Sequence, residues 1–291
     1  MNIRQNLSVV LALVVLGMVL IAFIMTRQDI KDLTEIYRAR RNMESDTHKS
    51  PLIVSPEEGR FKEQRNELSM VLNNLLMLYG QQSCQILKLS KSRLKVSENG
   101  GWCADMSSGT GGAHKWDKGF SKALSKFFKG KTVGSFGDGP GLYKKNVELL
   151  GEVKSYTAYD GAPYCETVTN GTVIFLDLTV PQYNLPIFDW VISVEVGEHI
   201  PAKFEDIYLD NLARHAREGI VMSWAVPGQG GLSHVNNKPL EEVKEQMRRR
   251  GFEFSLESGE PLRKAASFMW LRQNVHVYNR VSPSSLVEED A

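Results

Sequence analysis

The sequence predicts an α/β fold in which a seven-stranded, mainly parallel sheet has helices on both faces and is preceded by an N-terminal transmembrane helix. Two observations lead to this fold class. Between residues 131 and 280, seven short apolar runs alternate with amphipathic stretches of helical spacing, which is the pattern of βαβ units. Ahead of them, residues 7–25 form a run without any charged side chain.

The apolar run at 7–25 has the length and composition of a membrane span. Roughly 19 residues at ~1.5 Å each cover a hydrocarbon core ~30 Å thick, and no polar stripe runs along the helix. The alternative is a cleaved signal peptide, which would make the protein secreted. The run is longer than a usual signal core, and no small-x-small cleavage site follows it. We therefore predict a single-pass anchor at 1–26 that contacts the lipid bilayer through residues 7–25.

The side of the membrane on which the following domain lies is left open by the sequence. Basic residues follow the span, which favours a cytoplasmic domain; they are Arg27, Lys31, Arg38, Arg40 and Arg41. A long domain is nevertheless translocated largely regardless of its flanking charge. The protein is expected in a membrane, with the endomembrane system as one location.

The cysteines and one short motif bear on the same question. Cys84, Cys103 and Cys165 fit a reduced compartment, or a lumenal one with one disulfide and one remaining thiol. Asn170, Gly171 and Thr172 form an N-glycosylation sequon, which matters only if the domain is lumenal.

The rest of the chain divides by composition. We predict a polar juxtamembrane stalk at 27–59, an amphipathic helical segment at 60–97, the α/β domain at 98–280 and a disordered tail at 281–291. The helical segment is predicted from apolar residues at helical spacing, namely Phe61, Leu68, Val71, Leu72, Leu75, Leu76 and Leu78. This apolar face is expected to pack on the domain, with self-association as the alternative.

The seven apolar runs have the length of strands. They are VGSF, SYTAY, VIFLDL, FDWVISV, GIVMSW, FEFSL and NVHVYN, in chain order. The last two are expected to form an antiparallel pair at one sheet edge. A helix at about 117–129 precedes the first strand and is expected to cover one face of the sheet.

Composition bounds the class of protein. The 291 residues are 42% hydrophobic and 24% charged, which is ordinary for a globular domain. The 35 Lys and Arg balance 34 Asp and Glu to a net charge of +1, so the chain has no nucleic-acid signature.

A glycine-rich loop, SFGDGPG, follows the first strand and opens a helix. Gly137, Gly139 and Gly141 allow a tight turn and a close approach of the backbone to a ligand. The spacing is G-x-G-x-G, whereas a nicotinamide dinucleotide site has G-x-G-x-x-G, so a nicotinamide-dependent oxidoreductase is disfavoured. We expect these glycines and Asp138 to bind a nucleoside cofactor. Asp160 ends the second strand about 20 residues later, where a carboxylate accepts hydrogen bonds from ribose hydroxyls.

The loop resembles motif I of the class I S-adenosylmethionine (AdoMet)-dependent methyltransferases, which have a Rossmann-like fold. The resemblance implies that AdoMet is the cofactor, and that Asp177, after the third strand, lies against the adenine amino group. Within this class the chain resembles the type 11 enzymes and the methyltransferase-like protein 24 group. The residues that carry the resemblance are GGWC at 100–103, SFGDGPG at 135–141, FDWVISVEVGEHIP at 188–201 and SWAVPGQGG at 223–231.

The resemblance implies methyl transfer, with O-methylation of an unidentified acceptor as the first choice. One departure supports an alternative. Ser135 stands where many relatives carry an acidic residue, so the domain is alternatively a catalytically inactive interaction module with an AdoMet-binding fold.

A second group of polar residues follows the fourth and fifth strands. Glu195, Glu198 and His199 form E-x-x-E-H, and His234 lies in the loop after the fifth strand. The motif is similar to one that holds a divalent metal in some O-methyltransferases. These four residues are the predicted catalytic residues and the predicted ligands of Mg²⁺, Mn²⁺ or Zn²⁺. Two alternatives stay open: a histidine acts as general base without a metal, or the motif only caps the strand.

Overall fold

The computed structural model describes residues 56–90, 96–103 and 114–281. The predicted anchor at 1–26 lies outside these ranges, as do residues 27–55 of the predicted stalk and 282–291 of the predicted tail. Within the described ranges, none of the helices combines the length and the apolar composition that a membrane span requires.

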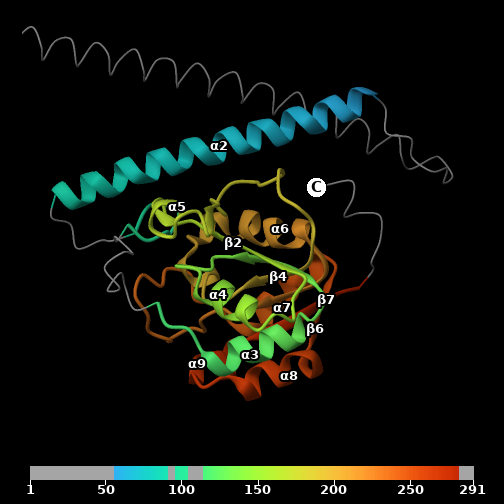
Figure 1. The fold of residues 1–291 in the computed structure, drawn as a ribbon. Helices are drawn as coiled ribbons and strands as arrows, with labels where there is room; N and C mark the ends of the chain where they lie inside the picture. Colours follow the sequence, from blue (N-terminus) through green and yellow to red (C-terminus); the bar gives the residue numbers. More distant parts are fainter. Residues whose placement is uncertain (1–55, 91–95, 104–113, 282–291) are drawn as a thin grey trace, which may run out of the picture. The chain divides into compact units, whose positions relative to one another are not determined.

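A single sheet of seven strands forms the centre of the domain (Figure 1). The strands are β1 (Thr132–Phe136), β2 (Ser155–Asp160), β3 (Val173–Phe175), β4 (Phe188–Ser193), β5 (Ala216–Met222), β6 (Phe252–Ser255) and β7 (His276–Arg280). Their order is β3-β2-β1-β4-β5-β7-β6, and the first five in chain order are parallel. This is the predicted Rossmann-like sheet.

The edge formed by the last two strands differs from the simplest prediction. β6 and β7 pair antiparallel as predicted, but β7 lies between β5 and β6 and is antiparallel to both. The last strand of the chain therefore occupies an inner position, and β6 forms the edge. β3, at the other edge, is shorter than its apolar run, so Asp177 lies two residues beyond the strand.

Helices cover both faces of the sheet, as predicted. They are α2 (Pro56–Leu89), α3 (Lys118–Phe127), α4 (Leu142–Leu149), α5 (Cys165–Val168), α6 (Glu205–His215), α7 (Leu240–Arg249), α8 (Leu256–Ala265) and α9 (Met269–Asn274), with short 3₁₀ turns η3 (Gly197–His199) and η4 (Ala202–Phe204). One core joins α3, α4, α8 and α9 to the sheet, and a second joins α6 and α7 to its other face. Figure 1 shows α6 across the sheet from α3 and α8.

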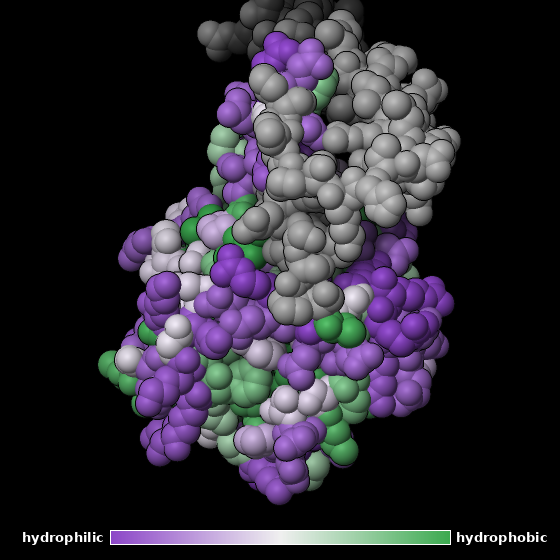
Figure 2. All heavy atoms as spheres, turned by 90° about the vertical axis from the view of Figure 1, so that its right-hand side faces the viewer, coloured by the Kyte–Doolittle hydropathy of each residue, from purple (hydrophilic) through white to green (hydrophobic). Residues whose placement is uncertain are grey.

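Neighbouring residues of a strand point to opposite faces of the sheet and so belong alternately to the two cores. Val191 and Ile220 pack with α6 and α7, whereas Ile192 and Val221 pack with α3 and α8. On the domain face in Figure 2, hydrophilic side chains surround smaller hydrophobic areas, as on an ordinary protein surface.

Helix α2 packs on the domain mainly through polar side chains together with Met77, and not through the predicted apolar face. Asn73 contacts the edge strand like a peptide group: its Nδ2 donates to the Phe175 carbonyl (3.0 Å) and its Oδ1 accepts from the Asp177 amide (2.9 Å). Ser69 donates to the Pro181 carbonyl. Most of the apolar residues that predicted the helix are exposed, namely Phe61, Leu68, Val71, Leu72, Leu75 and Leu78. Helical spacing predicted the helix correctly but not the side that faces the domain. The side that faces the domain carries polar groups, because α2 forms hydrogen bonds with the exposed edge of the sheet.

Asp117 joins the start of α3 to the other end of the chain. Its Oδ1 caps α3 by accepting from the Phe120 amide (3.0 Å), and its Oδ2 accepts from the Ser267 hydroxyl (2.7 Å) and the Phe268 amide (2.8 Å). Burial raises the pKa of this carboxyl group, but the hydrogen bonds outweigh burial and hold the pKa below its usual value.

We expect Asp117→Ala to lower the free energy of unfolding of the fragment from residue 56 by roughly 2–4 kcal/mol, because it removes a helix cap and charged hydrogen bonds. Denaturant unfolding measures the loss. A group with a lowered pKa stabilises the fold above its unfolded pKa, so the difference should shrink as the pH falls below about 4. Equal midpoints at neutral pH would contradict this role for Asp117.

Candidate functional site

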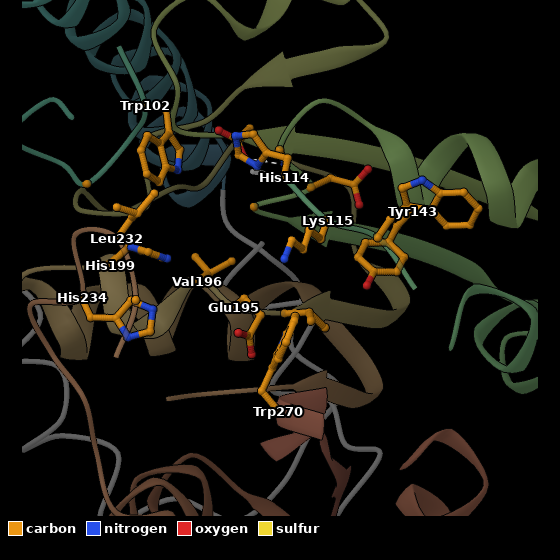
Figure 3. A pocket seen from close by; sticks show the side chains of 18 of the residues that line it. Trp102, His114, Lys115, Tyr143, Glu195, Val196, His199, Leu232, His234 and Trp270 are labelled. Carbon is orange, nitrogen blue, oxygen red and sulfur yellow. Dashed lines mark hydrogen bonds between the residues drawn. The ribbon is translucent and has the colours of Figure 1, made fainter. Parts of the chain in front are cut away.

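A cavity of about 710 Å³ opens at the carboxyl ends of the parallel strands, where ligands bind in open α/β sheets. Its walls come from the glycine-rich loop, the ends of β2 and β4, the loop after β5, and three segments at 99–102, 114–116 and 268–273. Figure 3 shows side chains from these elements converging on the same space.

The glycine-rich loop has the backbone that its composition predicts. Gly137, Gly139 and Gly141 have φ angles of 94°, 57° and 78°, which side chains rarely tolerate. The amides of Gly137 and Asp138 donate to the Tyr159 carbonyl (2.8 and 2.9 Å), which ties the loop to β2. Gly137, Asp138 and Gly139 line the cavity, as predicted. Gly141 lies behind it as the N-cap of α4.

Asp160 ends β2, as predicted, and it lines the cavity. Its Oδ2 accepts from the Gly139 amide (2.7 Å) and its Oδ1 from the Ala162 amide (2.8 Å), so the carboxylate also fixes the loop. Burial raises its pKa. A carboxylate oxygen can accept two hydrogen bonds, so each oxygen of Asp160 can accept one more from a ligand hydroxyl.

Asp138 supplies the carboxylate that Ser135 lacks. Its Oδ1 accepts from the Ser135 hydroxyl (2.8 Å) and the Tyr156 hydroxyl (3.3 Å), and its Oδ2 accepts from the Lys144 amide at the start of α4 (3.2 Å). Burial raises its pKa to about 7. The serine therefore positions an acidic side chain three residues later, at the wall of the same cavity.

Asp177, like Gly141, is a predicted cofactor residue that does not line the cavity. Its Oδ1 accepts from the Thr179 amide (2.9 Å) and hydroxyl (2.6 Å), and its Oδ2 accepts from Asn99 (3.1 Å). Because β3 ends two residues earlier, the side chain turns into this network. Leu176 and Leu178 line the cavity in its place, and so does Asn99.

Glu195 is separated from the other predicted metal ligands. It has a φ of 58°, a strained conformation for a residue with a side chain. Its amide donates to the Ser223 hydroxyl, which donates in turn to its Oε1, both at 2.7 Å. Glu195 lines the cavity, burial raises its pKa, and Figure 3 shows it on the Trp270 side. The predicted set of four ligands is thus reduced to three.

Glu198, His199 and His234 form a compact cluster, with one ligand atom from each lying within 4.8 Å of the others. Glu198 is fully buried, and within the described residues neither carboxylate oxygen has a hydrogen-bond partner. Burial, with the charge of Glu195, raises its pKa to about 8. Its carbonyl accepts from the amides of Val235 and Asn236, which fixes the loop after β5 against η3.

His199 has one nitrogen committed and one free for a ligand. Its Nδ1 lies 3.2 Å from the Ser233 carbonyl, which only accepts, so Nδ1 carries the proton and Nε2 presents a lone pair. Burial lowers its pKa to about 4, so the ring is neutral at neutral pH. The His199 and His234 rings meet edge to face at 5.1 Å. A neutral imidazole beside an unpaired buried carboxylate suits a divalent cation better than it suits a general base.

The loop after β5 borders the cavity, as the glycines in SWAVPGQGG suggest. Gln229, Gly230, Gly231 and Leu232 lie in its wall. The loop is held at its ends, where the indole Nε1 of Trp224 donates to the Asn236 carbonyl (2.6 Å).

No protein-family model and no curated protein sequence matches this chain. Solved structures are similar in fold. Magnesium protoporphyrin IX methyltransferase from Synechocystis, with bound S-adenosylhomocysteine, is 13% identical over 56% of this chain and 83% of its own, with a TM-score of 0.42. A sugar N-methyltransferase from Streptoalloteichus is 11% identical over 61% and 92%, with a TM-score of 0.46. An amino pentose methyltransferase from Micromonospora, with bound AdoMet, is 10% identical over 61% and 97%, with a TM-score of 0.44.

Several residues that line the cavity were not predicted from the sequence. Lys115 points into the cavity (Figure 3), and its ammonium lies 5.9 Å from the centre of the Trp270 ring. Trp270 stacks on Phe268 at 4.6 Å. Tyr143, in the first turn of α4, also lines the cavity. Tyr143 comes just after the glycine-rich loop, whereas Lys115 and Trp270 belong to no motif, and only the folded chain brings 114–116 and 268–273 to the same wall.

Proposed function

We propose that this chain is an AdoMet-dependent methyltransferase of the methyltransferase-like protein 24 group that methylates a hydroxyl oxygen. One observation carries the proposal: the glycine-rich loop, Asp160, His199 and His234 line one cavity at the carboxyl ends of the strands, and Glu198 lies buried beside the two histidines. A nucleoside site and a polar cluster thus lie side by side, as transfer between two bound molecules requires.

AdoMet lies against the loop, whose glycines leave room for its amino acid end, and the ribose hydroxyls donate to Asp160. The acceptor lies on the side of Trp102, His199 and Gln229. Its oxygen attacks the methyl carbon while the bond from that carbon to sulfur breaks, which leaves S-adenosylhomocysteine. Glu195 receives the hydroxyl proton, since its carboxylate lines the cavity and burial raises its pKa.

Glu198, His199 and His234 are the residues that would hold a divalent cation. The fit rests on a buried carboxylate whose oxygens make no hydrogen bond of ordinary geometry to the described residues, and on an imidazole whose Nδ1 is held by the Ser233 carbonyl. If these residues held a cation, it would lower the pKa of an acceptor hydroxyl. His199 and His234 themselves line this side of the cavity and orient the acceptor.

Calorimetric titration of the fragment from residue 56 with AdoMet and S-adenosylhomocysteine tests the cofactor assignment. Saturable binding of one molecule per chain is expected. Binding without methyl transfer to any acceptor would favour the inactive interaction module, and absence of binding would refute the proposed function.

We also propose that residues 7–25 anchor the protein in a membrane. Full-length protein should resist alkaline carbonate extraction, and a chain lacking residues 1–26 should not. Leu16→Arg should reduce integration, because a central charge opposes insertion by ~2.5–3.5 kcal/mol, whereas Leu16→Ile should not. A mature chain that starts after residue 25 would instead identify a cleaved signal peptide.

A further inference from the structure

We infer that the domain matures in an oxidising compartment, on the lumenal or extracellular side of the membrane, and carries an N-linked glycan on Asn170. Two separate features support this: the surroundings of the sequon and the pairing of the cysteines. Neither depends on the proposed methyl transfer.

The sequon lies in an exposed turn between α5 and β3. Asn170, Gly171 and Thr172 are all exposed. Asn170 and Gly171 have φ angles of 51° and 73°, so the chain reverses sharply there. Main-chain bonds hold the turn, since the Gly171 amide donates to the Glu166 carbonyl (2.8 Å) and the Thr172 amide to the Thr169 carbonyl (3.1 Å). A glycan is bulky and hydrophilic, so it is compatible with folding only where the asparagine side chain reaches solvent, as here.

The glycan would also leave the cavity open. The turn leads into the amino end of β3, which is parallel to β2, whereas the cavity lies at the carboxyl ends. None of the three sequon residues lines the cavity. The first residue after the sequon that lines it is Leu176.

The cysteines independently indicate an oxidising compartment. Cys84 of α2 and Cys103 form a disulfide, which ties α2 to the segment that supplies Asn99 and Trp102 to the cavity wall. Stable disulfides are rare in reducing compartments. The third cysteine, Cys165, is buried, and burial raises the pKa of its thiol, so it reacts poorly with disulfides.

Both modifications use reagents of secretory compartments. An oxidised thiol–disulfide carrier takes two electrons from the thiols of Cys84 and Cys103, which lose two protons as the sulfur–sulfur bond forms. For the glycan, a lipid-linked oligosaccharide pyrophosphate is the donor. The anomeric carbon forms a bond to Asn170 Nδ2, its bond to the pyrophosphate oxygen breaks, Nδ2 loses a proton, and the lipid pyrophosphate leaves.

Expression of the full chain in eukaryotic cells, followed by digestion with a peptide N-glycosidase, tests the glycan. Wild-type protein should gain electrophoretic mobility on digestion. Asn170→Gln and Thr172→Ala should migrate like the digested protein and no longer respond. Thr172→Ser preserves the sequon and should respond. Asn74→Gln removes an exposed asparagine outside any sequon and should behave like wild type.

Thiol alkylation of the same denatured samples tests the compartment. One thiol per chain should react before reduction and all three after it. Three reactive thiols before reduction would overturn the oxidising compartment, and an undigestible wild-type protein would overturn the glycan. The chain has a second sequon at the start of the predicted span, Asn6-Leu7-Ser8. A glycan that remains in Asn170→Gln but disappears in Asn6→Gln would place the amino terminus, and not the domain, on the lumenal side.

Discussion

Alanine at Glu198 or His199 is expected to lower methyl-transfer turnover by ~10²–10⁴-fold, a loss of the size that a positioned catalytic group causes, because the cluster orients the acceptor, while AdoMet affinity stays within a few-fold. His199 lines the part of the cavity proposed for the acceptor and Glu198 is buried beside it in the same cluster, whereas the glycine-rich loop and Asp160 line the part proposed for AdoMet. Steady-state kinetics with a methyl acceptor and calorimetric titration with AdoMet separate the two effects.

Activity measured with and without a chelator distinguishes a bound metal from a histidine base. If the cluster holds a cation, a chelator should abolish activity, Mg²⁺, Mn²⁺ or Zn²⁺ should restore it, and His234→Ala should match His199→Ala. Loss of activity in His199→Ala with no effect of chelator would instead support a histidine base. His276→Ala removes a buried histidine outside the cavity and serves as the control. Wild-type turnover in all the cluster variants would show that the E-x-x-E-H motif only caps the strand.

Gly139→Val and Asp160→Ala should each weaken AdoMet binding strongly. A Cβ at Gly139 would lie 3.0 Å from His114 Nδ1, at a φ of 57° that a branched side chain does not tolerate. Loss of Asp160 removes a charged hydrogen-bond acceptor worth ~1.5–3 kcal/mol, which corresponds to roughly 10- to 100-fold in affinity. Calorimetric titration with AdoMet measures both losses.

Matched variants separate cofactor contact from general damage. Gly151 also has a positive φ, of 67°, but a Cβ there meets nothing within 4 Å, so Gly151→Val reproduces the backbone strain outside the cavity. Asp189→Ala removes a partly buried carboxylate at the amino end of β4. Both should retain AdoMet affinity. Wild-type affinity in Gly139→Val and Asp160→Ala would refute the cofactor site.

The sheet and the glycine-rich wall of the cavity could be predicted because their signals are local. Each strand is a short apolar run, and the positive φ angles of Gly137 and Gly139 follow from composition. Asp160 was placed correctly because it ends a strand next to that loop. The fate of Asp177 was not predictable, since it depends on where β3 ends and on Asn99, a residue far away in the chain.

Two of the failures share one physical cause: side-chain partners distant in sequence decide the outcome. Helical spacing cannot tell that Asn73 protects a strand edge, so it assigned the wrong face of α2 to the domain. The E-x-x-E-H pattern cannot reveal that Ser223 draws Glu195 away from the cluster. Ser135 was interpreted as a missing carboxylate because its contact with Asp138 exists only in the folded loop.

Transfer of a labelled methyl group from AdoMet to any product, in membranes that contain the full-length chain, tests the central claim most directly. The wild-type chain should produce a labelled product that is absent with Gly139→Val and with His199→Ala and is retained with Gly151→Val. A wild-type chain that binds AdoMet but yields no label above membranes without it, or equal label from the Gly139→Val chain, would contradict the account.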